Sequence, residues 1–157
     1  MSDIRNRTIK GLTKGDTFSV TRTFTEMDVM AFGEISRDYN PIHYDQRFVE
    51  TKGFTQKICH GLLVGGMITE IGGQIGWLAS GINFKFNKPV YLGDTVTCTL
   101  TIIKMNEKGK ATAKAQFSNQ NGTVVMEAEL FGIIPVDRDR EVLKIMVEEG
   151  DPSNKLR

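Results

Sequence analysis

The sequence predicts an α+β domain in which one long buried helix is wrapped by an antiparallel sheet. A mostly apolar run over residues 58–78 has the length and the all-round apolar character of a buried helix. From residue 82 to residue 134, segments of alternating apolar and polar residues follow one another, separated by turn residues. A strongly twisted sheet of strands about ten residues long, each spanning roughly 33 Å, can wrap such a helix. At 157 residues, the chain is expected to form a single domain over residues 1–157.

The N-terminal part of the chain is expected to supply the first strand. Residues 1–14 are polar and are expected to be a lead-in to the domain. Residues 16–24 alternate apolar and polar side chains, with Phe18 and Val20 on the inward face. This period of two predicts a strand.

A helix is expected next, from about residue 26 to residue 36. Thr25 and Asp28 have the spacing of a capping box, in which an acid lies three residues after a threonine. The apolar residues that follow have helical spacing; they are Met27, Met30, Ala31, Phe32 and Ile35.

The helix leads into a turn over residues 38–43, which read Asp-Tyr-Asn-Pro-Ile-His. Pro41 has no backbone N–H and disfavours helical geometry at Asn40, so the segment cannot be one continuous helix. On an unbroken helix, Asp38 and His43 would lie roughly 140° apart, whereas a turn allows them to converge. An acid beside an imidazole is the minimum equipment for moving a proton to or from water. A short helix is expected near residues 46–51.

The long helix over residues 58–78 carries five glycines after Gly61. Each glycine costs roughly 1 kcal/mol of helix propensity relative to alanine. Close packing of the helix on the sheet explains them, and so does a narrow channel for a substrate. Glu70 and Gln74 interrupt the run, which makes it too polar for a membrane span.

The remaining strands are expected at residues 82–86, 95–105, 111–117 and 123–134, with a hairpin at Asn121-Gly122. Residues 136–157 are charged and are expected to form either a frayed tail or a short helix. Such a helix would have one apolar face, made by Val142, Leu143, Met146 and Val147.

The composition excludes several classes of function. Net charge is +1, from 20 Lys and Arg against 19 Asp and Glu, so nucleic acid and anionic membranes are not expected partners. Cys59 and Cys98 make neither a disulfide framework nor a zinc site, and no metal or other cofactor is expected. Residues 1–7 lack a hydrophobic run, so we expect no signal peptide and a cytoplasmic location.

Three motifs together resemble one family. They are residues 38–43, the dipeptide at residues 60–61 (His-Gly), and residues 86–95, which read Phe-Asn-Lys-Pro-Val-Tyr-Leu-Gly-Asp-Thr. Residues 15–135 are similar to the MaoC-like, hydratase-2 branch of the hotdog-fold proteins, and in size the chain resembles its single-hotdog (R)-specific enoyl-CoA hydratases. The resemblance implies a homodimer in which the sheets of two subunits join and an acyl tunnel lies at the interface. It also implies an acyl-CoA or acyl-carrier-protein thioester as substrate.

The resemblance implies roles for individual residues. Asp38 and His43 match the catalytic pair that holds and activates water. The expected oxyanion and substrate-binding residues are Gly61, Thr69, Asn40 and His60. Addition of water to an enoyl thioester builds negative charge on the carbonyl oxygen, and a helix N-terminus at Gly61 offers an N–H group there. Which residue takes the proton of the water stays open.

Other readings of these residues remain open. Asn40 is expected to brace the turn, and His60 to have a structural or gating role. Cys59 and His60 could form a nucleophilic dyad. Glu70 could face solvent, pair with a lysine, or act as the catalytic carboxylate of a hotdog thioesterase. The competing functions are dehydration of a 3-hydroxyacyl chain on acyl carrier protein, thioester hydrolysis, and acyl-CoA binding without catalysis.

The sequence departs from the family pattern at three places. Arg37 stands where glycine is common, and Gln46 and Lys57 stand where prolines are common. These residues bear on the rigidity of the segment around the turn and on the preferred acyl chain, and they remove no catalytic atom.

Overall fold

The computed structural model describes residues 3–156 of the chain. Its helices and strands follow one another in the order α1 (Asp3–Lys10), β1 (Thr17–Thr23), α2 (Glu26–Ser36), the 3₁₀ helix η1 (Pro41–His43), α3 (Gln46–Thr51), α4 (Gly61–Gly65), α5 (Met67–Ile75), β2 (Leu78–Phe86), β3 (Thr95–Met105), β4 (Lys110–Ser118), β5 (Val124–Ile133) and α6 (Asp137–Glu148).

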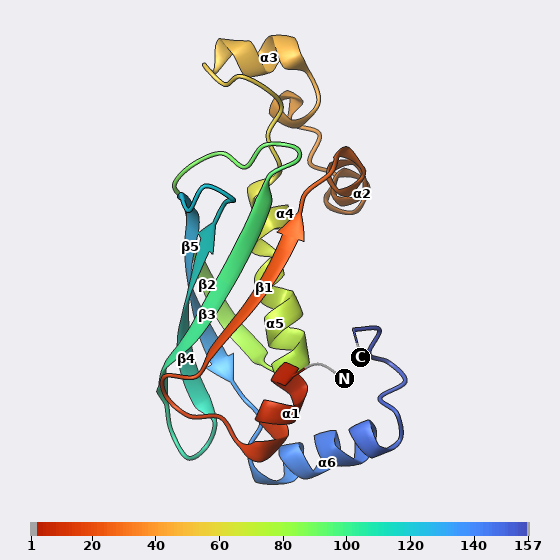
Figure 1. Cartoon of the computed structure of the whole chain (residues 1–157), viewed down its shortest axis with the longest axis vertical. Helices are drawn as coiled ribbons and strands as arrows, with labels where there is room; N and C mark the ends of the chain where they lie inside the picture. The colour runs from red at the N-terminus through yellow and green to blue at the C-terminus, as the bar shows by residue number, and fades with distance from the viewer. Residues whose placement is uncertain (1–2, 157) are drawn as a thin grey trace.

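The five strands form one antiparallel sheet in the order β1-β3-β4-β5-β2. The sheet curves around α4 and α5, while α2 and α3 lie near one end of it and α1 and α6 near the other (Figure 1). This arrangement confirms the expected α+β architecture. The alternation of residue types predicted all five strands, and it is clearest in β3, β4 and β5, where one face of the strand is buried and the other is not.

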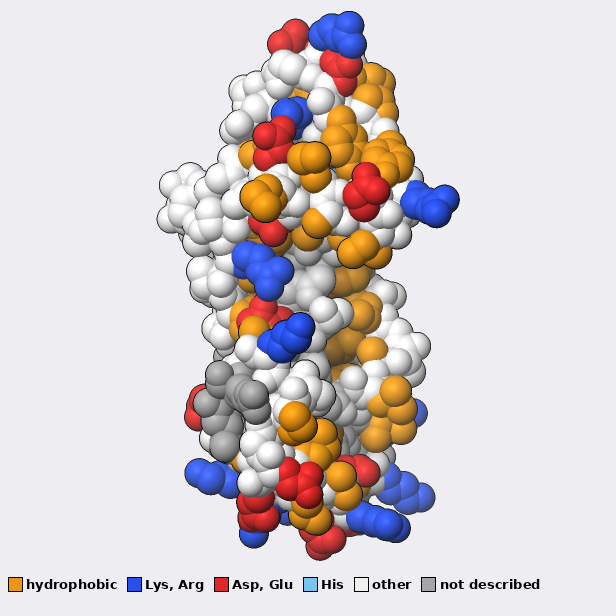
Figure 2. All heavy atoms as spheres, turned by 90° about the vertical axis from the view of Figure 1, so that its right-hand side faces the viewer, with side chains coloured by type: hydrophobic (Ala, Val, Ile, Leu, Met, Phe, Trp, Pro, Cys, Tyr) orange, Lys and Arg blue, Asp and Glu red, His pale blue; other side chains and the backbone are white. Residues whose placement is uncertain are grey.

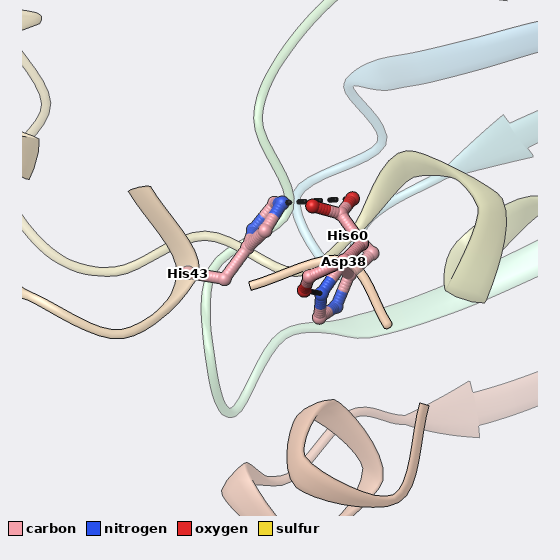
Figure 3. A group of neighbouring side chains, drawn as sticks. All are labelled: Asp38, His43 and His60. Carbon is pink, nitrogen blue, oxygen red and sulfur yellow. Dashed lines mark hydrogen bonds and ion pairs between the residues drawn. The ribbon is translucent and has the colours of Figure 1, made fainter. Parts of the chain in front are cut away.

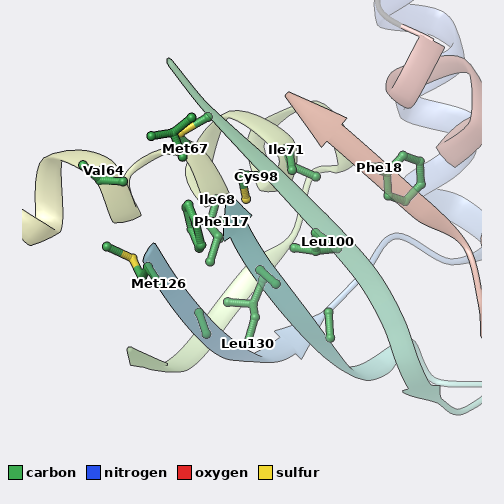
Figure 4. Packing of buried hydrophobic residues seen from close by; sticks show 14 of the residues in the cluster. Phe18, Val64, Met67, Ile68, Ile71, Cys98, Leu100, Phe117, Met126 and Leu130 are labelled. Carbon is green, nitrogen blue, oxygen red and sulfur yellow. The ribbon is translucent and has the colours of Figure 1, made fainter. Parts of the chain in front are cut away.

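The core lies between the central helix and the concave face of the sheet. Ile68 and Ile71 of α5 meet Leu100, Phe117 and Leu130 of the strands, and all five are buried (Figure 4). Side chains with this period of two on the strands and of 3.6 on the helix form one continuous cluster.

The helix expected over residues 58–78 is shorter and is divided in two. The chain changes hydrogen-bond pattern at Gly66, where α4 ends and α5 begins. Helix α5 ends at Ile75 because Gly76 takes a φ of 82°, in the left-handed region that favours glycine. Strand β2 therefore begins at Leu78, four residues earlier than the expected start.

Two of the helix glycines are explained by packing. A Cβ atom at Gly65 would lie 2.9 Å from the ring of Phe84, and one at Gly61 would collide with the ring of Phe86. The two rings are stacked, with centroids 6.2 Å apart, and lie directly against the helix backbone. At these two positions close helix–sheet packing is the favoured explanation.

The expectation that residues 1–14 are only a lead-in is wrong, because they contain α1. Arg5 is buried and donates hydrogen bonds to the carbonyl oxygens of Gly73 and Gln74 at the C-terminal end of α5. It also forms an ion pair with Asp151, at 3.1 Å. We call the four residues Arg5, Gln74, Asp151 and Asn154 the terminal clasp, since Gln74 and Asn154 exchange two amide hydrogen bonds of 3.0 Å beside that ion pair.

The C-terminal segment forms the helix α6, so the helical alternative for residues 136–157 is correct for its first part. Asp139 accepts a hydrogen bond from the backbone N–H of Val136 at the start of α6. Among the described helices, none combines the length and the apolar character needed to cross a bilayer.

One side of the central helix is open to solvent in the single chain. Leu62, Thr69 and Gly73 are exposed, as are most residues of the edge strand β2. The apolar residues Met27, Met30 and Ile35 are also exposed, on α2. Figure 2, which views this side, shows apolar side chains gathered over much of the surface. The sheet thus covers the helix on one side only.

Candidate active site

The turn after α2 is built by local hydrogen bonds. Arg37 ends α2 in the left-handed conformation, with a φ of 58°, and its N–H donates to the carbonyl of Gly33 at 2.8 Å. This geometry explains why glycine is common there. Asp38 Oδ1 then accepts from the N–H of Asn40 at 3.1 Å, and Asn40 Oδ1 accepts from the N–H of Ile42 at 3.2 Å. Asn40 therefore braces the turn, as expected for a side chain that caps η1.

The two successive turns bring the acid and the imidazole together. His43 Nε2 lies 3.9 Å from Asp38 Oδ2 (Figure 3). The side chain of Asp38 is half exposed, at 49%, whereas that of His43 is 8% exposed. The expected convergence of these two side chains is observed.

The hydrogen bonds of His43 fix which ring nitrogen carries the proton. His43 Nδ1 lies 2.8 Å from the carbonyl oxygen of Ile58, which can only accept, so Nδ1 is the donor. Burial lowers the pKa of His43 below its usual value of 6.5; the Ile58 carbonyl opposes this shift, His60 adds to it and Asp38 opposes it. Near neutral pH the ring is thus uncharged and presents the lone pair of Nε2 to Asp38.

Two hydrogen-bond acceptors therefore face each other across a short gap. A water that donates one hydrogen to each at about 2.8 Å spans a separation of roughly 4 Å, similar to the 3.9 Å between Nε2 and Oδ2. Such a water keeps its lone pairs free for attack. The arrangement suits the activation of water for addition to a substrate.

A cavity of about 630 Å³ opens beside the pair. Asp38, His43, His60 and Gly61 line it together with apolar side chains, among them Phe54, Ile58, Leu62, Phe86, Val90 and Met126. Its volume lies within the usual range for small-molecule sites of about 300–1,000 Å³. As the first residue of α4, Gly61 has an N–H with no acceptor inside the helix.

Thr69 lies elsewhere. Its hydroxyl donates to the carbonyl of Gly66 at 2.6 Å, and it is exposed on the open side of α5. It does not line the cavity in the single chain.

Glu70 forms an ion pair with Arg22, at 3.1 Å, so the ion-pair alternative holds for Glu70, with an arginine rather than a lysine as its partner.

Cys59 is unsuited to nucleophilic chemistry. Burial raises the pKa of its thiol to about 12, so the reactive thiolate is not formed near neutral pH. The structure thus argues against a dyad of Cys59 and His60.

Asp38, His43 and His60 are close enough to be considered as ligands of a metal ion. The rings of His43 and His60 face each other, however, with centroids 3.8 Å apart and 31° between their planes. One nitrogen of each ring is also hydrogen-bonded within the protein, His43 Nδ1 to the Ile58 carbonyl and His60 Nε2 to the Asp38 carbonyl. The cluster is better described as a tilted pair of imidazoles beside a carboxylate.

Sequence reasoning missed Tyr44, Gly33 and Lys88. The hydroxyl of Tyr44 lies 3.3 Å from His60 Nε2 and 3.3 Å from the carbonyl of Asp38, and it occupies the space above Gly33 that a Cβ atom would need. Lys88 lines the cavity. The sequence offered one signal for two of them: each is next to a residue of a motif. Tyr44 follows His43 of the first motif, and Lys88 precedes Pro89 of the third.

Known proteins resemble this chain in sequence. A sequence model of the family described as MaoC like domain matches residues 12–125. A mitochondrial 3-hydroxyacyl-(acyl-carrier-protein) dehydratase of Arabidopsis thaliana is 32% identical over 140 residues, which are 85% of this chain and 83% of that protein. An (R)-specific enoyl-CoA hydratase of Rhodospirillum rubrum is 31% identical over 126 residues, which are 78% of this chain and 88% of that protein.

The fold is similar to solved structures as well. The (R)-hydratase from A. caviae involved in PHA biosynthesis superposes with a TM-score of 0.75 at 29% identity, over 80% of this chain and 99% of that one. The expected hotdog fold is thereby confirmed. The matched residues include the turn, the start of α4 and the block before β3. The chain belongs to the MaoC-like domain family, and the relatives named here are hydro-lyases.

Proposed function

We propose that the protein is an (R)-specific enoyl-CoA hydratase, which adds water reversibly and with syn geometry to a trans-2-enoyl thioester to give a (3R)-3-hydroxyacyl thioester. The observation that carries the proposal is the pair of acceptors, His43 Nε2 and Asp38 Oδ2, held 3.9 Å apart at the wall of a largely apolar cavity. The relatives support the proposal as well, because one is named a hydratase and one a dehydratase, and hydration and dehydration are the two directions of one reversible reaction.

The proposed mechanism follows from the hydrogen bonds of the site. Water donates to His43 Nε2 and Asp38 Oδ2, and its oxygen attacks C3 of the substrate while Nε2 takes the proton. The electrons of the C2–C3 double bond move toward the thioester, whose oxygen gains negative charge near the N–H of Gly61. The proton on Nε2 then passes to C2 on the same face, which gives syn addition and restores the neutral imidazole.

A hydration assay tests the proposal directly. Crotonyl-CoA and longer trans-2-enoyl-CoA thioesters should lose their enoyl absorbance in the presence of the protein, and the product should be the (3R)-3-hydroxyacyl thioester by chiral chromatography. Release of free thiol without loss of the double bond would instead indicate a thioesterase. Tight acyl-CoA binding in calorimetry with no turnover would indicate a binding module.

Dehydration of a 3-hydroxyacyl chain on acyl carrier protein is the second candidate. The Arabidopsis relative that carries this name is about as similar to the chain as the bacterial hydratase, at 32% and 31% identity. The two carriers share a phosphopantetheine arm, so the same site serves both. Rates measured with matched acyl chains on CoA and on acyl carrier protein separate them.

Lys88 is expected to contribute to binding of the carrier. This residue lines the cavity, is exposed, and has no ion-pair partner within residues 3–156. We expect Lys88→Ala to raise KM for crotonyl-CoA by roughly three- to fivefold. This corresponds to the loss of one exposed ion pair, between Lys88 and a phosphate of CoA. KM for the N-acetylcysteamine thioester, which has no phosphate, should stay unchanged. Lys114→Ala, on the outer face of the sheet, is the control and should alter neither value.

We also propose that the chain acts as a homodimer. The edge strand β2 leaves a row of backbone groups without a partner strand, and the adjacent helix face with Leu62, Thr69 and Gly73 is exposed. A second copy would cover both surfaces at once. Sedimentation equilibrium should give twice the chain mass of 17.5 kDa, and a mass of 17.5 kDa at working concentration would contradict the proposal.

A further inference from the structure

His60 is a deeply buried polar side chain of the candidate site. It is 1% exposed, and it lies where the chain enters α4. Its ring faces that of His43, with centroids 3.8 Å apart, and also contacts the ring of Phe32 at 4.9 Å. Because it is packed on these rings, His60 forms a fixed surface beneath the imidazole that carries the free Nε2.

The hydrogen bond of His60 reaches the other member of the pair. His60 Nε2 lies 2.9 Å from the backbone carbonyl of Asp38 (Figure 3). A carbonyl only accepts, so Nε2 carries the hydrogen. This bond, together with the contact from the Tyr44 hydroxyl at 3.3 Å, fixes the peptide from which the Asp38 carboxylate projects.

The second nitrogen of His60 makes no polar contact of this kind. Nδ1 is buried and has no hydrogen-bond partner among the described residues. The ring therefore acts through packing and through Nε2.

We propose that His60 is a positioning residue for the reaction: its ring supports the imidazole of His43 and its Nε2–H holds the main chain of Asp38, so that one side chain sets the gap between the two acceptors. This inference rests on the proposed hydratase activity and replaces the expectation that His60 binds substrate. Gly33 belongs to the same device, because only a glycine there leaves room for the Tyr44 hydroxyl.

The groups that face His43 determine its pKa and how that pKa changes when His60 is replaced. Asp38 and His60 lie against it, the Ile58 carbonyl accepts from its Nδ1, and the Tyr44 ring meets it edge-on at 6.2 Å. Lys88 and Cys59 are the other titratable side chains of the cavity. His60 and burial both oppose a positive charge on His43. Loss of the His60 ring should thus raise the pKa of His43 toward 6.5.

Two variants separate the two contacts. His60→Gln keeps an N–H donor for the Asp38 carbonyl but removes the ring, whereas His60→Phe keeps a ring against His43 but removes the donor. Both should lower kcat for hydration by roughly tenfold to a hundredfold, the usual result of a small displacement of reacting groups, with KM changed by less than about threefold.

Titration of His43 distinguishes positioning from a merely structural role. The chain has two histidines, so NMR of the untagged His60 variants reports a single imidazole. The pKa of His43 should lie below 6.5 in the wild-type protein, rise in His60→Gln and remain low in His60→Phe. Lys114→Ala, on the exposed face of the sheet and away from the cavity, should leave the titration of His43 unchanged.

The outcomes are distinct. An unchanged His43 titration together with an unchanged kcat in both folded variants overturns the inference. A loss of activity that only follows the folded fraction of each variant, as measured by thermal unfolding, overturns it as well. Absence of hydration by the wild-type protein would count against the proposed function instead. The NMR titration tests the link between His60 and His43 without any substrate.

Discussion

His43→Ala is expected to lower kcat/KM for hydration by about 10²- to 10⁴-fold, because it removes the lone pair that takes the proton of the attacking water. Asp38→Asn should have an effect of similar size. An amide at this position replaces one acceptor oxygen by a donor, so a water can no longer donate to both partners across the 3.9 Å gap. Progress curves of enoyl absorbance with purified variants provide the measurement.

The controls for this experiment use the same assay. Glu141→Gln removes an exposed carboxylate from α6, at a distance from the cavity, and should leave kcat/KM unchanged. Thermal unfolding checks that each variant is folded. Wild-type rates in folded His43→Ala and Asp38→Asn would refute the mechanism, whatever the fold.

Asp151→Asn is expected to reduce the free energy of unfolding by about 3–5 kcal/mol, because it breaks the buried ion pair between Asp151 and the guanidinium of Arg5. Both side chains are nearly buried, at 8% and 4% exposed, so solvent compensates little of the loss. Asparagine tolerates the left-handed φ of 44° at this position, so the substitution reports on charge rather than on backbone strain. Urea unfolding at neutral pH provides the measurement.

A matched ion pair serves as the control. Glu70→Gln breaks the pair with Arg22, which is 48% exposed on the arginine and 27% on the glutamate, and should cost less than about 1 kcal/mol. In an Arg5→Met background, the cost of Asp151→Asn should shrink to less than about 1 kcal/mol, since the two residues are coupled. If Asp151→Asn lowered the free energy of unfolding equally in the wild-type protein and in Arg5→Met, the ion pair of the terminal clasp would not contribute to stability.

Local signals allowed most of the fold to be predicted. The capping box of Thr25 and Asp28 is formed as expected, with hydrogen bonds in both directions, and α2 begins at the next residue. The turn at Pro41 was also predictable, because proline chemistry acts on adjacent residues. For the same reason the meeting of Asp38 and His43 could be foreseen from their spacing.

Features that depend on distant residues could not be predicted. Helix α1 is polar and is held by Arg5, whose partner Asp151 lies 146 residues away in sequence. The surroundings of His60 depend on the meeting of three segments, at Phe32, His43 and the Asp38 carbonyl. The close approach of the Phe84 ring to Gly65, one residue before the break at Gly66, is likewise not revealed by the helix periodicity.

The terminal clasp has a consequence for the order of events on the ribosome. The strands and the turn with Asp38 and His43 are complete once residue 133 has been synthesised, but the carboxylate of Asp151 emerges 18 residues later. Until then the ion pair between Arg5 and Asp151 cannot form, whereas the carbonyl oxygens of Gly73 and Gln74 that Arg5 also bonds are already present. A nascent chain stalled just short of that point would lack this ion pair between its two ends, although the turn with Asp38 and His43 is already complete.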